Sequence, residues 1–345
     1  MELSQLLKAT VEKNSSDLHI SPNQPPLVRI DGDLVPLENM PVLSPEETKT
    51  LMYSVMDAEQ RKEFENTLEN DFSTAIKDVA RFRVNVFQQM YGVAGVFRVI
   101  PEKVPTIDEL GMPPIFKDLL RLPNGLILVT GPTGSGKSTT LAAMVDYINT
   151  NEPLHIITIE DPIEFTHKSK KCLINQREVH RDTREFSAAL RASLREDPDV
   201  ILVGELRDLD TIRLALTAAE TGHLVLATLH TSSAPRTINR IVDVFPASEK
   251  NMIRNMLSES LQAVICQTLV KKIGGGRAAA LEIMVGTTGI RNLIREDKIA
   301  QMYSAIQTGS QLGMRTLDQY LQDLVSKKII TQETAKESSI NKSTA

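Results

Sequence analysis

A glycine-rich segment near the middle of the chain has the residue types of a phosphate-binding loop. It follows the apolar run 126–129 and reads Gly-Pro-Thr-Gly-Ser-Gly-Lys-Ser over residues 131–138. A strand, a glycine loop and a helix in this order gather backbone N–H groups around one phosphate. Lys137 is expected to reach the β- and γ-phosphates, and the Ser138 hydroxyl to hold Mg²⁺. The residues expected to contact a nucleoside triphosphate are Gly131, Pro132, Thr133, Gly134, Ser135, Gly136, Lys137, Ser138 and Thr139.

Three further apolar runs each end at titratable side chains. These are Glu160 and Glu164 after the first run, Glu205 after the second and His230 after the third. In open α/β sheets, ligands bind beyond the carboxyl ends of the strands. We therefore expect these four groups beside the γ-phosphate and its attacking water.

The carboxylates are expected to divide two tasks between them. Glu205 stands where P-loop enzymes have their Walker B carboxylate, but Gly204 occupies the preceding place, where an aspartate is usual. Glu205 is therefore expected to organise the Mg²⁺ shell, partly through water. Glu164 is the first candidate for polarising the attacking water, and Glu160 the second. A solvated carboxylate at a strand end is the alternative for each.

Two histidines bracket one predicted strand. The seven residues from His223 to His230, at ~3.3 Å each, separate them by ~23 Å, so they cannot both touch one phosphate. His230, at the carboxyl end, is the candidate γ-phosphate sensor. His223 is expected either to face a neighbouring subunit or to cap the end of its helix.

Arginines in the first hundred residues offer positive charge for phosphoryl transfer. Side chains alternate in a strand, so Arg81 and Arg83 share one face, and Arg98 lies similarly on the partner strand. An arginine finger stabilises the charge on the transferring phosphoryl group. A finger from this region would act across a subunit boundary; a solvated sheet face is the alternative.

Composition bounds the class of protein. The 345 residues suggest two domains, and 41% apolar with 24% charged residues describes an ordinary globular chain. No apolar run approaches the 18 residues of a membrane span, and no secretory signal is expected. Cys172 and Cys266 are expected to be reduced thiols. The net charge of −5 and the absence of tryptophan argue against a nucleic-acid partner.

The pattern along the chain predicts how these groups are positioned. Residues 1–100 indicate an α+β module with a hairpin over 27–35 and a helix that starts after the capping Ser44. The proline-rich stretch 101–114, which begins at Pro101, indicates a linker. From 115 to 345, alternating strands and helices predict a mainly parallel sheet. Its strands are expected near 126–130, 155–160, 200–205 and 224–230, and its helices near 137–149, 183–196 and 208–220.

The C-terminal part is expected to be mostly helical. One strand is predicted around residues 279–285, after the glycines 274–276. The polar tail 338–345 is expected to fray.

Together these motifs resemble a known family, the type II/IV secretion superfamily of hexameric ATPases. Within it the match is to the retraction motors of type IV pili, and it covers almost the whole chain. Residues 131–138 are similar to the family's Walker A motif, 158–164 to its Asp box, and 201–205 to its atypical Walker B motif, glycine included. Residues 221–231 resemble its His box.

The resemblance implies a mixed α/β fold, with an N-terminal PAS-like α+β domain and a C-terminal RecA-like P-loop ATPase domain. It also implies a six-membered ring, ATP and Mg²⁺ as cofactors, and completion of the active site by N-terminal arginines. Arg81, Arg83 and Arg98 are therefore expected to act as a set.

Two features separate the branches of the family. Extension and export members usually carry two Cys-x-x-Cys pairs that bind zinc, and this chain has no such pair. Residues 289–296 are similar to a motif tied to retraction, with Gly289 in place of its alanine. That glycine is expected to loosen the helix start by ~1 kcal/mol. Without the family, the segment indicates an amphipathic helix with exposed Arg291 and Arg295.

The prediction is a hexameric ATPase motor that powers type IV pilus retraction and twitching motility. Its expected partners are the other copies in the ring, the platform protein of the inner membrane and an accessory retraction paralogue. It would be cytoplasmic and associated peripherally with the inner membrane at the pilus base. The alternatives are that the chain is itself the accessory paralogue, a non-hydrolysing nucleotide-gated scaffold, or a RecA-like nucleic-acid motor.

Overall fold

The computed structural model describes residues 2–76, 79–100 and 103–339, which form two compact units. The first unit is Met1–Lys103 and the second is Val104–Ala345. The boundary therefore falls inside the expected linker 101–114. Ile107 and Met112 are buried in the core of the second unit, so 104–114 belongs to that unit. Pro101 lies outside the described residues.

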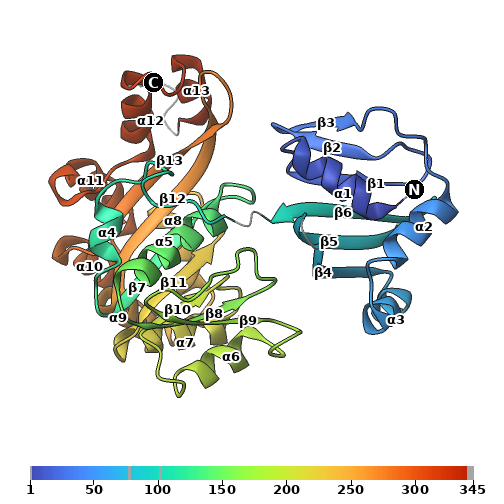
Figure 1. Cartoon of the computed structure of the whole chain (residues 1–345). Helices are drawn as coiled ribbons and strands as arrows, with labels where there is room; N and C mark the ends of the chain where they lie inside the picture. The colour runs from blue at the N-terminus through green and yellow to red at the C-terminus, as the bar shows by residue number, and fades with distance from the viewer. Residues whose placement is uncertain (1, 77–78, 101–102, 340–345) are drawn as a thin grey trace. The chain divides into compact units, whose positions relative to one another are not determined.

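The first unit is an antiparallel sheet with helices, as the α+β pattern predicts (Figure 1). Its strand order is β3-β2-β1-β6-β5-β4. The elements are α1 (Leu3–Glu12), β1 (Asp17–Ile20), β2 (Leu27–Ile30), β3 (Asp33–Pro36), α2 (Pro45–Tyr53), α3 (Ala58–Thr67), β4 (Glu69–Ile76), β5 (Ala80–Gln89) and β6 (Gly92–Ile100). Alternate residues of β5, among them Phe82 and Val84, are fully buried, which leaves the polar residues between them on the other face.

Local signals in this unit are confirmed. Asp31 and Gly32 both have positive φ, 49° and 101°, as a two-residue hairpin turn between β2 and β3 requires. Helix α2 begins at Pro45 with a complete capping box, in which Ser44 and Glu47 each bond the other's backbone N–H.

The second unit is built on a mixed sheet of order β13-β12-β7-β11-β10-β8-β9. All neighbours from β12 to β9 are parallel, and β13 runs antiparallel to β12. The strands are β7 (Gly125–Thr130), β8 (His155–Glu160), β9 (Leu173–Glu178), β10 (Val200–Val203), β11 (Leu224–Leu229), β12 (Leu261–Lys271) and β13 (Arg277–Val285). The mainly parallel sheet is confirmed.

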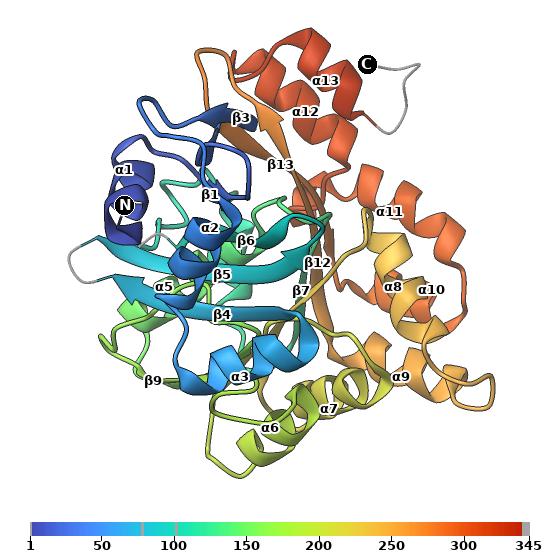
Figure 2. The same ribbon diagram turned by 90° about the vertical axis from the view of Figure 1, so that its right-hand side faces the viewer.

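Helices cover both faces of this sheet. One core layer joins it to α6, α7, α8, α9, α10 and α11, and the other to α4, α5, α12 and α13. Figure 2 shows α8 beside the β12–β13 pair. The helices are α4 (Ile115–Leu119), α5 (Lys137–Asn151), α6 (Phe186–Ser193), α7 (Leu209–Glu220), α8 (Ala234–Asp243), α9 (Lys250–Ser260), α10 (Thr288–Arg295), α11 (Met302–Thr308), α12 (Leu317–Ser326) and α13 (Gln332–Ser338).

Two strands depart from the expectation. Strand β12 lies where only helix was predicted, and β9 was not expected. Strand β12 follows directly on α9, which ends at Ser260, so no turn residue marks the change. It pairs with neighbours on both sides and most of its residues are buried, so its apolar run lacks the alternation that marks a half-exposed strand.

Two residues at the start of the expected frayed tail are ordered. Ser338 is the last residue of α13, and the Ser339 hydroxyl donates to the Asp318 carboxylate at 2.8 Å. The remainder of the predicted tail, 340–345, lies outside the described residues. Among the helices that the structure describes, none is both long enough and apolar enough to cross a bilayer.

Candidate nucleotide-binding and catalytic site

The glycine loop lies between β7 and α5, as predicted. All six residues of β7 are buried, so the strand fixes the start of the loop in the centre of the sheet. Gly131, Gly134 and Gly136 have φ values of 143°, 76° and 88°, in the region that favours glycine. A Cβ on Gly131 would lie only 2.2 Å from the backbone oxygen of Gln267. The glycines therefore permit both the curl of the loop and its close packing on β12.

Lys137 opens α5 and folds back over this loop. Its Nζ donates to the carbonyl oxygens of Gly131 at 2.9 Å and Pro132 at 3.0 Å, and lies 3.5 Å from Nδ1 of His230. Burial lowers the pKa of Lys137, while the charges of Glu205 and Glu164 raise it. Glu205 and Glu164 therefore lie within electrostatic reach of the Lys137 ammonium.

Glu205 is the centre of an ionic network at the carboxyl edge of the sheet. Its Oε1 lies 3.1 Å from Nε2 of His230, and its Oε2 accepts from Nε of Arg207 at 2.7 Å. Arg207 also reaches Asp161, with 3.4 Å between Nη1 and Oδ2. Glu205, Arg207 and His230 line a cavity of about 490 Å³, together with Arg240. The structure thus brings Lys137, Glu205 and His230 together, as predicted.

Glu160 and Glu164 are joined through the turn after β8. The Glu160 carboxylate accepts hydrogen bonds from the Thr158 hydroxyl at 2.7 Å, from Nε2 of Gln176 at 3.3 Å and from the Glu164 backbone N–H. Burial is the main cause that raises the pKa of Glu160 to about 7; the charge of Glu164 contributes to this rise, and the three hydrogen bonds oppose it. Glu160 is therefore a partly buried, hydrogen-bonded carboxyl and not a fully solvated one. The catalytic roles of Glu160 and Glu164 stay predictions.

Gly204 has a packing reason for its place before Glu205. Its N–H donates to the Ile159 oxygen at 2.8 Å, and its own carbonyl accepts from the Thr228 hydroxyl. A Cβ at this position would lie 3.2 Å from the Ile159 oxygen and 3.3 Å from Cα of Glu160. The usual aspartate would therefore press on the backbone that carries Glu160.

Gly204→Ala is expected to lower the free energy of unfolding by roughly 1–3 kcal/mol, because the added methyl must displace packed backbone. Urea denaturation of wild type and variant measures the change. A variant with unchanged stability would show that β8 and β10 can separate at no cost.

His223 lies at the opposite end of β11 from His230. Its backbone N–H donates to the Ala218 oxygen at 3.1 Å, and its ring Nδ1 lies 3.0 Å from the same oxygen. These contacts cap the C-terminal end of α7, which is one of the two expected positions for this side chain. A catalytic role of His223 stays a prediction.

The three predicted arginines lie in the first unit, on β5 and β6. Arg83 and Arg98 are direct cross-strand neighbours, so they share one face of the sheet. Arg83 pairs with Asp71 at 2.7 Å, and Arg98 pairs with the buried Asp17 at 2.8 Å. Nη2 of Arg81 lies 3.5 Å from the Ser73 hydroxyl. The face is therefore not simply solvated, and the finger role of this set stays a prediction.

Two residues of the site escape the sequence reasoning. Arg207 follows Glu205 by two places and holds its carboxylate, a spacing that carries no recognised motif. Gln267 on β12 donates to the Ser135 oxygen and accepts from the Thr140 hydroxyl, both at 2.7 Å. No signal could have found Gln267 while its segment was taken for a helix.

The segment similar to the retraction motif forms α10. Ile290 and Ile294 are fully buried, as the amphipathic pattern predicts. Arg291, however, is not an exposed surface residue. It donates to the carbonyl oxygens of Gly286 at 2.7 Å and Ser258 at 2.6 Å, and also to that of Glu259. The guanidinium thus caps the C-terminal end of α9, where arginine is favoured because the carbonyls lack helical partners.

Gly289→Ala is expected to raise the free energy of unfolding by about 0.4–1 kcal/mol. An added Cβ would meet only the Thr287 hydroxyl oxygen, at 3.8 Å, so the methyl fits without strain. Urea denaturation of this variant and of Gly204→Ala should give changes of opposite sign in the free energy of unfolding. A loss of stability at Gly289 would contradict the open packing seen there.

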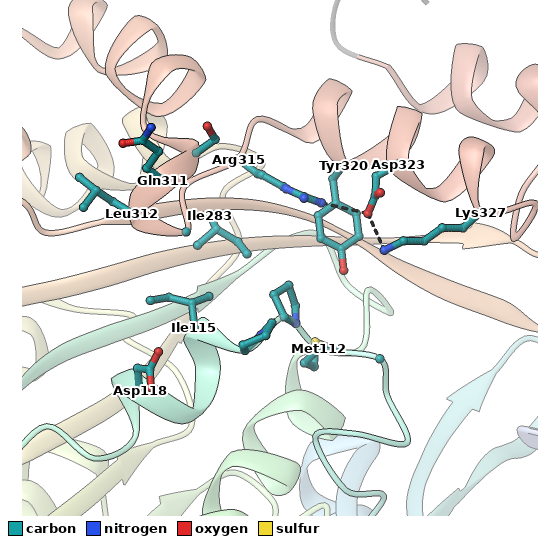
Figure 3. A pocket seen from close by; sticks show the side chains of 15 residues that line it. Met112, Ile115, Asp118, Ile283, Gln311, Leu312, Arg315, Tyr320, Asp323 and Lys327 are labelled. Atoms are coloured by element: carbon teal, nitrogen blue, oxygen red, sulfur yellow. Dashed lines mark hydrogen bonds and ion pairs between the residues drawn. The ribbon is translucent and has the colours of Figure 1, made fainter.

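A second cavity of about 660 Å³ in the same unit contains none of the predicted site residues (Figure 3). It lies between residues 111–115, the 310–315 loop and α12. Asp323 on its wall is paired with Arg315 at 3.0 Å and Lys327 at 2.8 Å. Because these charges satisfy one another, the cavity presents no cluster for chemistry comparable with that around Glu205.

Comparison with known proteins identifies the family of the chain. The family model "Type II/IV secretion system protein" matches residues 2–277. The chain is 64% identical over 337 residues to the type IV pilus retraction ATPase PilT of Pseudomonas aeruginosa, covering 98% of each chain. It is 41% identical over 336 residues to the type IV pilus ATPase PilU of the same organism, covering 97% of this chain and 88% of PilU.

A solved structure described as the pilus retraction motor PilT with bound ADP superposes with a TM-score of 0.91. The two sequences are 49% identical, and the superposition covers 100% of this chain and 99% of the PilT chain. The mixed α/β architecture is thus shared with a relative that binds ADP. The chain belongs to the type II/IV secretion system protein family.

Proposed function

We propose that this protein is an ATPase motor that hydrolyses ATP to power retraction of type IV pili. The observation that carries the proposal is the convergence of Lys137, Glu205 and His230 on one edge of the sheet, with Glu164 in electrostatic reach of Lys137. Near full-length similarity to PilT supports the biological role.

Each group has a role that follows from its chemistry. Lys137 would exchange its loop carbonyls for the β- and γ-phosphates, because phosphate oxygens carry the greater negative charge. Glu164 would polarise the attacking water, with Glu160 as the second candidate. His230, whose Nε2 lies 3.1 Å from Oε1 of Glu205, would report the presence of the γ-phosphate to that carboxylate. Arg81, Arg83 and Arg98 would supply a cation from another copy of the chain.

The residues at the loop also fit Mg²⁺. Mg²⁺ takes oxygen ligands, commonly one or two carboxylates with waters and substrate phosphates. The Ser138 hydroxyl and the Glu205 carboxylate supply such oxygens. Within the described residues, no group of three or more His, Cys, Asp or Glu is arranged to hold a metal alone. Phosphates and water would therefore complete the shell, and the ion would neutralise charge on the β- and γ-phosphates.

In the cell, we propose a homohexameric ring on the cytoplasmic side of the inner membrane at the pilus base. It would act on the platform protein, with or without a PilU-type paralogue. The greater identity to PilT than to PilU favours the principal motor over the accessory one.

The test has a biochemical and a cellular arm. Purified protein with Mg²⁺ and ATP should release phosphate; none released under assembly conditions would favour a nucleotide-gated scaffold. A strain with this chain as its only retraction ATPase should twitch. Hydrolysis without twitching would favour the accessory paralogue, and stimulation of hydrolysis by DNA or RNA would favour a nucleic-acid motor.

A further inference from the structure

The side chain of Gln267 lies against the P-loop from the neighbouring strand. Strand β12 pairs in parallel with β7, and Cys266 stands opposite Thr130, the last residue before the loop. The next residue on β12, Gln267, therefore lies beside the loop itself. Gln267 is 4% exposed, so water does not compete for its hydrogen bonds.

Both polar atoms of the Gln267 amide form hydrogen bonds, one to the glycine loop and one to α5. Nε2 donates to the Ser135 oxygen at 2.7 Å, and Oε1 accepts from the Thr140 hydroxyl on α5 at 2.7 Å. The Ser135 carbonyl can only accept, so the group that faces it must donate, while the Gln267 amide oxygen accepts from the Thr140 hydroxyl. The amide therefore links the Ser135 carbonyl of the loop to the first turn of α5.

The bond to Ser135 also fixes the direction of a phosphate-binding N–H. The Ser135 carbonyl and the Gly136 N–H belong to one planar trans peptide, so they point in opposite directions. When Gln267 holds the carbonyl toward β12, the Gly136 N–H is turned away from β12. A Cβ on Gly136 would lie 2.8 Å from Nε2 of Gln267, which shows how closely the amide sits on this peptide.

We propose that Gln267 is a positioning residue for nucleotide binding: it holds the Ser135–Gly136 peptide so that the Gly136 N–H faces the β-phosphate. The inference rests on the proposed nucleotide site but not on the motor role. Because ADP and ATP share the β-phosphate, both should depend on Gln267 equally. A group that acts only on the transferred phosphoryl would instead distinguish ATP from ADP.

The experiment measures nucleotide affinity and turnover in the full chain carrying Gln267→Met. This change keeps the length of the side chain and removes both hydrogen bonds. The dissociation constants of ADP and ATP should rise together by about tenfold or more, from fluorescent-nucleotide displacement. The kcat at saturating ATP should change much less, so the effect appears in KM. A general loss of structure would lower both nucleotide affinity and kcat, and it would show in the circular dichroism spectrum.

Gln262→Met is the matched control, because Gln262 lies on the same strand and bonds the Asn124 oxygen, far along β12 from the loop. It should leave ADP affinity unchanged. If Gln267→Met does not fold, Gln267→Asn keeps the amide but shortens its reach to Ser135, and it should also weaken ADP. A folded variant of either kind that binds ADP within about twofold of wild type overturns the proposal. The ADP titration needs no hydrolysis, so failure of wild type to release phosphate would defeat the motor proposal alone.

Discussion

Glu205→Gln is expected to lower ATP turnover by roughly 10²–10⁴-fold while leaving nucleotide affinity within a few-fold, because a carboxylate that organises the Mg²⁺ shell becomes a neutral amide and a metal ion contributes several kcal/mol of charge stabilisation. The substitution keeps an oxygen for Arg207, which donates to the carboxylate at 2.7 Å. It removes the negative charge that faces Lys137 and lies 3.1 Å from Nε2 of His230. Phosphate release at saturating ATP measures turnover, and displacement of fluorescent ADP measures affinity.

A matched control separates this charge from charge loss in general. Glu196→Gln removes another carboxylate of the same unit. Glu196 pairs with Arg177 at 3.3 Å and is not part of the described site. It should hydrolyse ATP like wild type. The truncation Glu205→Ala should lose turnover as Glu205→Gln does. Undiminished hydrolysis in both Glu205 variants would remove this residue from the mechanism.

Much of the site was predictable because local chemistry determines it. The P-loop needs glycines at positive φ within eight residues, and that requirement is written in the sequence between 131 and 138. The convergence of Glu205 and His230 follows from a rule about parallel sheets, which places every carboxyl end at one edge. Helix starts such as Pro45 were equally visible, because a capping box involves only four neighbouring residues.

The missed parts depend on contacts between residues distant in sequence. Gln267 reaches Ser135 across 132 positions, and Arg291 caps a helix that ends more than 30 residues earlier. Strand β12 is recognisable only through its partners β7 and β13, since its own pattern fits a buried helix as well. The sequence therefore indicated the loop and the titratable groups at the strand ends, but not the distant side chains that hold them in place.

Glu160→Gln is expected to change the pH dependence of stability. Burial raises the pKa of Glu160 to about 7 from an ordinary value of 4.5. Between these values the folded chain holds a proton that the unfolded chain has released, so wild-type stability falls as pH rises from about 4.5 to about 7. Glutamine does not ionise, and its oxygen can still accept from the Thr158 hydroxyl. The variant should therefore gain roughly 2–3 kcal/mol relative to wild type between pH 5 and pH 8.

Urea denaturation at the two pH values measures this gain, with Glu337→Gln on the exposed side of α13 as the control for the substitution itself. A pH-independent difference between variant and wild type would show that Glu160 is not desolvated. The same variant decides between the two candidate bases. If Glu164 polarises the water, Glu160→Gln should retain ATP turnover. If Glu160 does so, its protonation should make wild-type turnover fall below about pH 7, and the variant should be inactive at every pH.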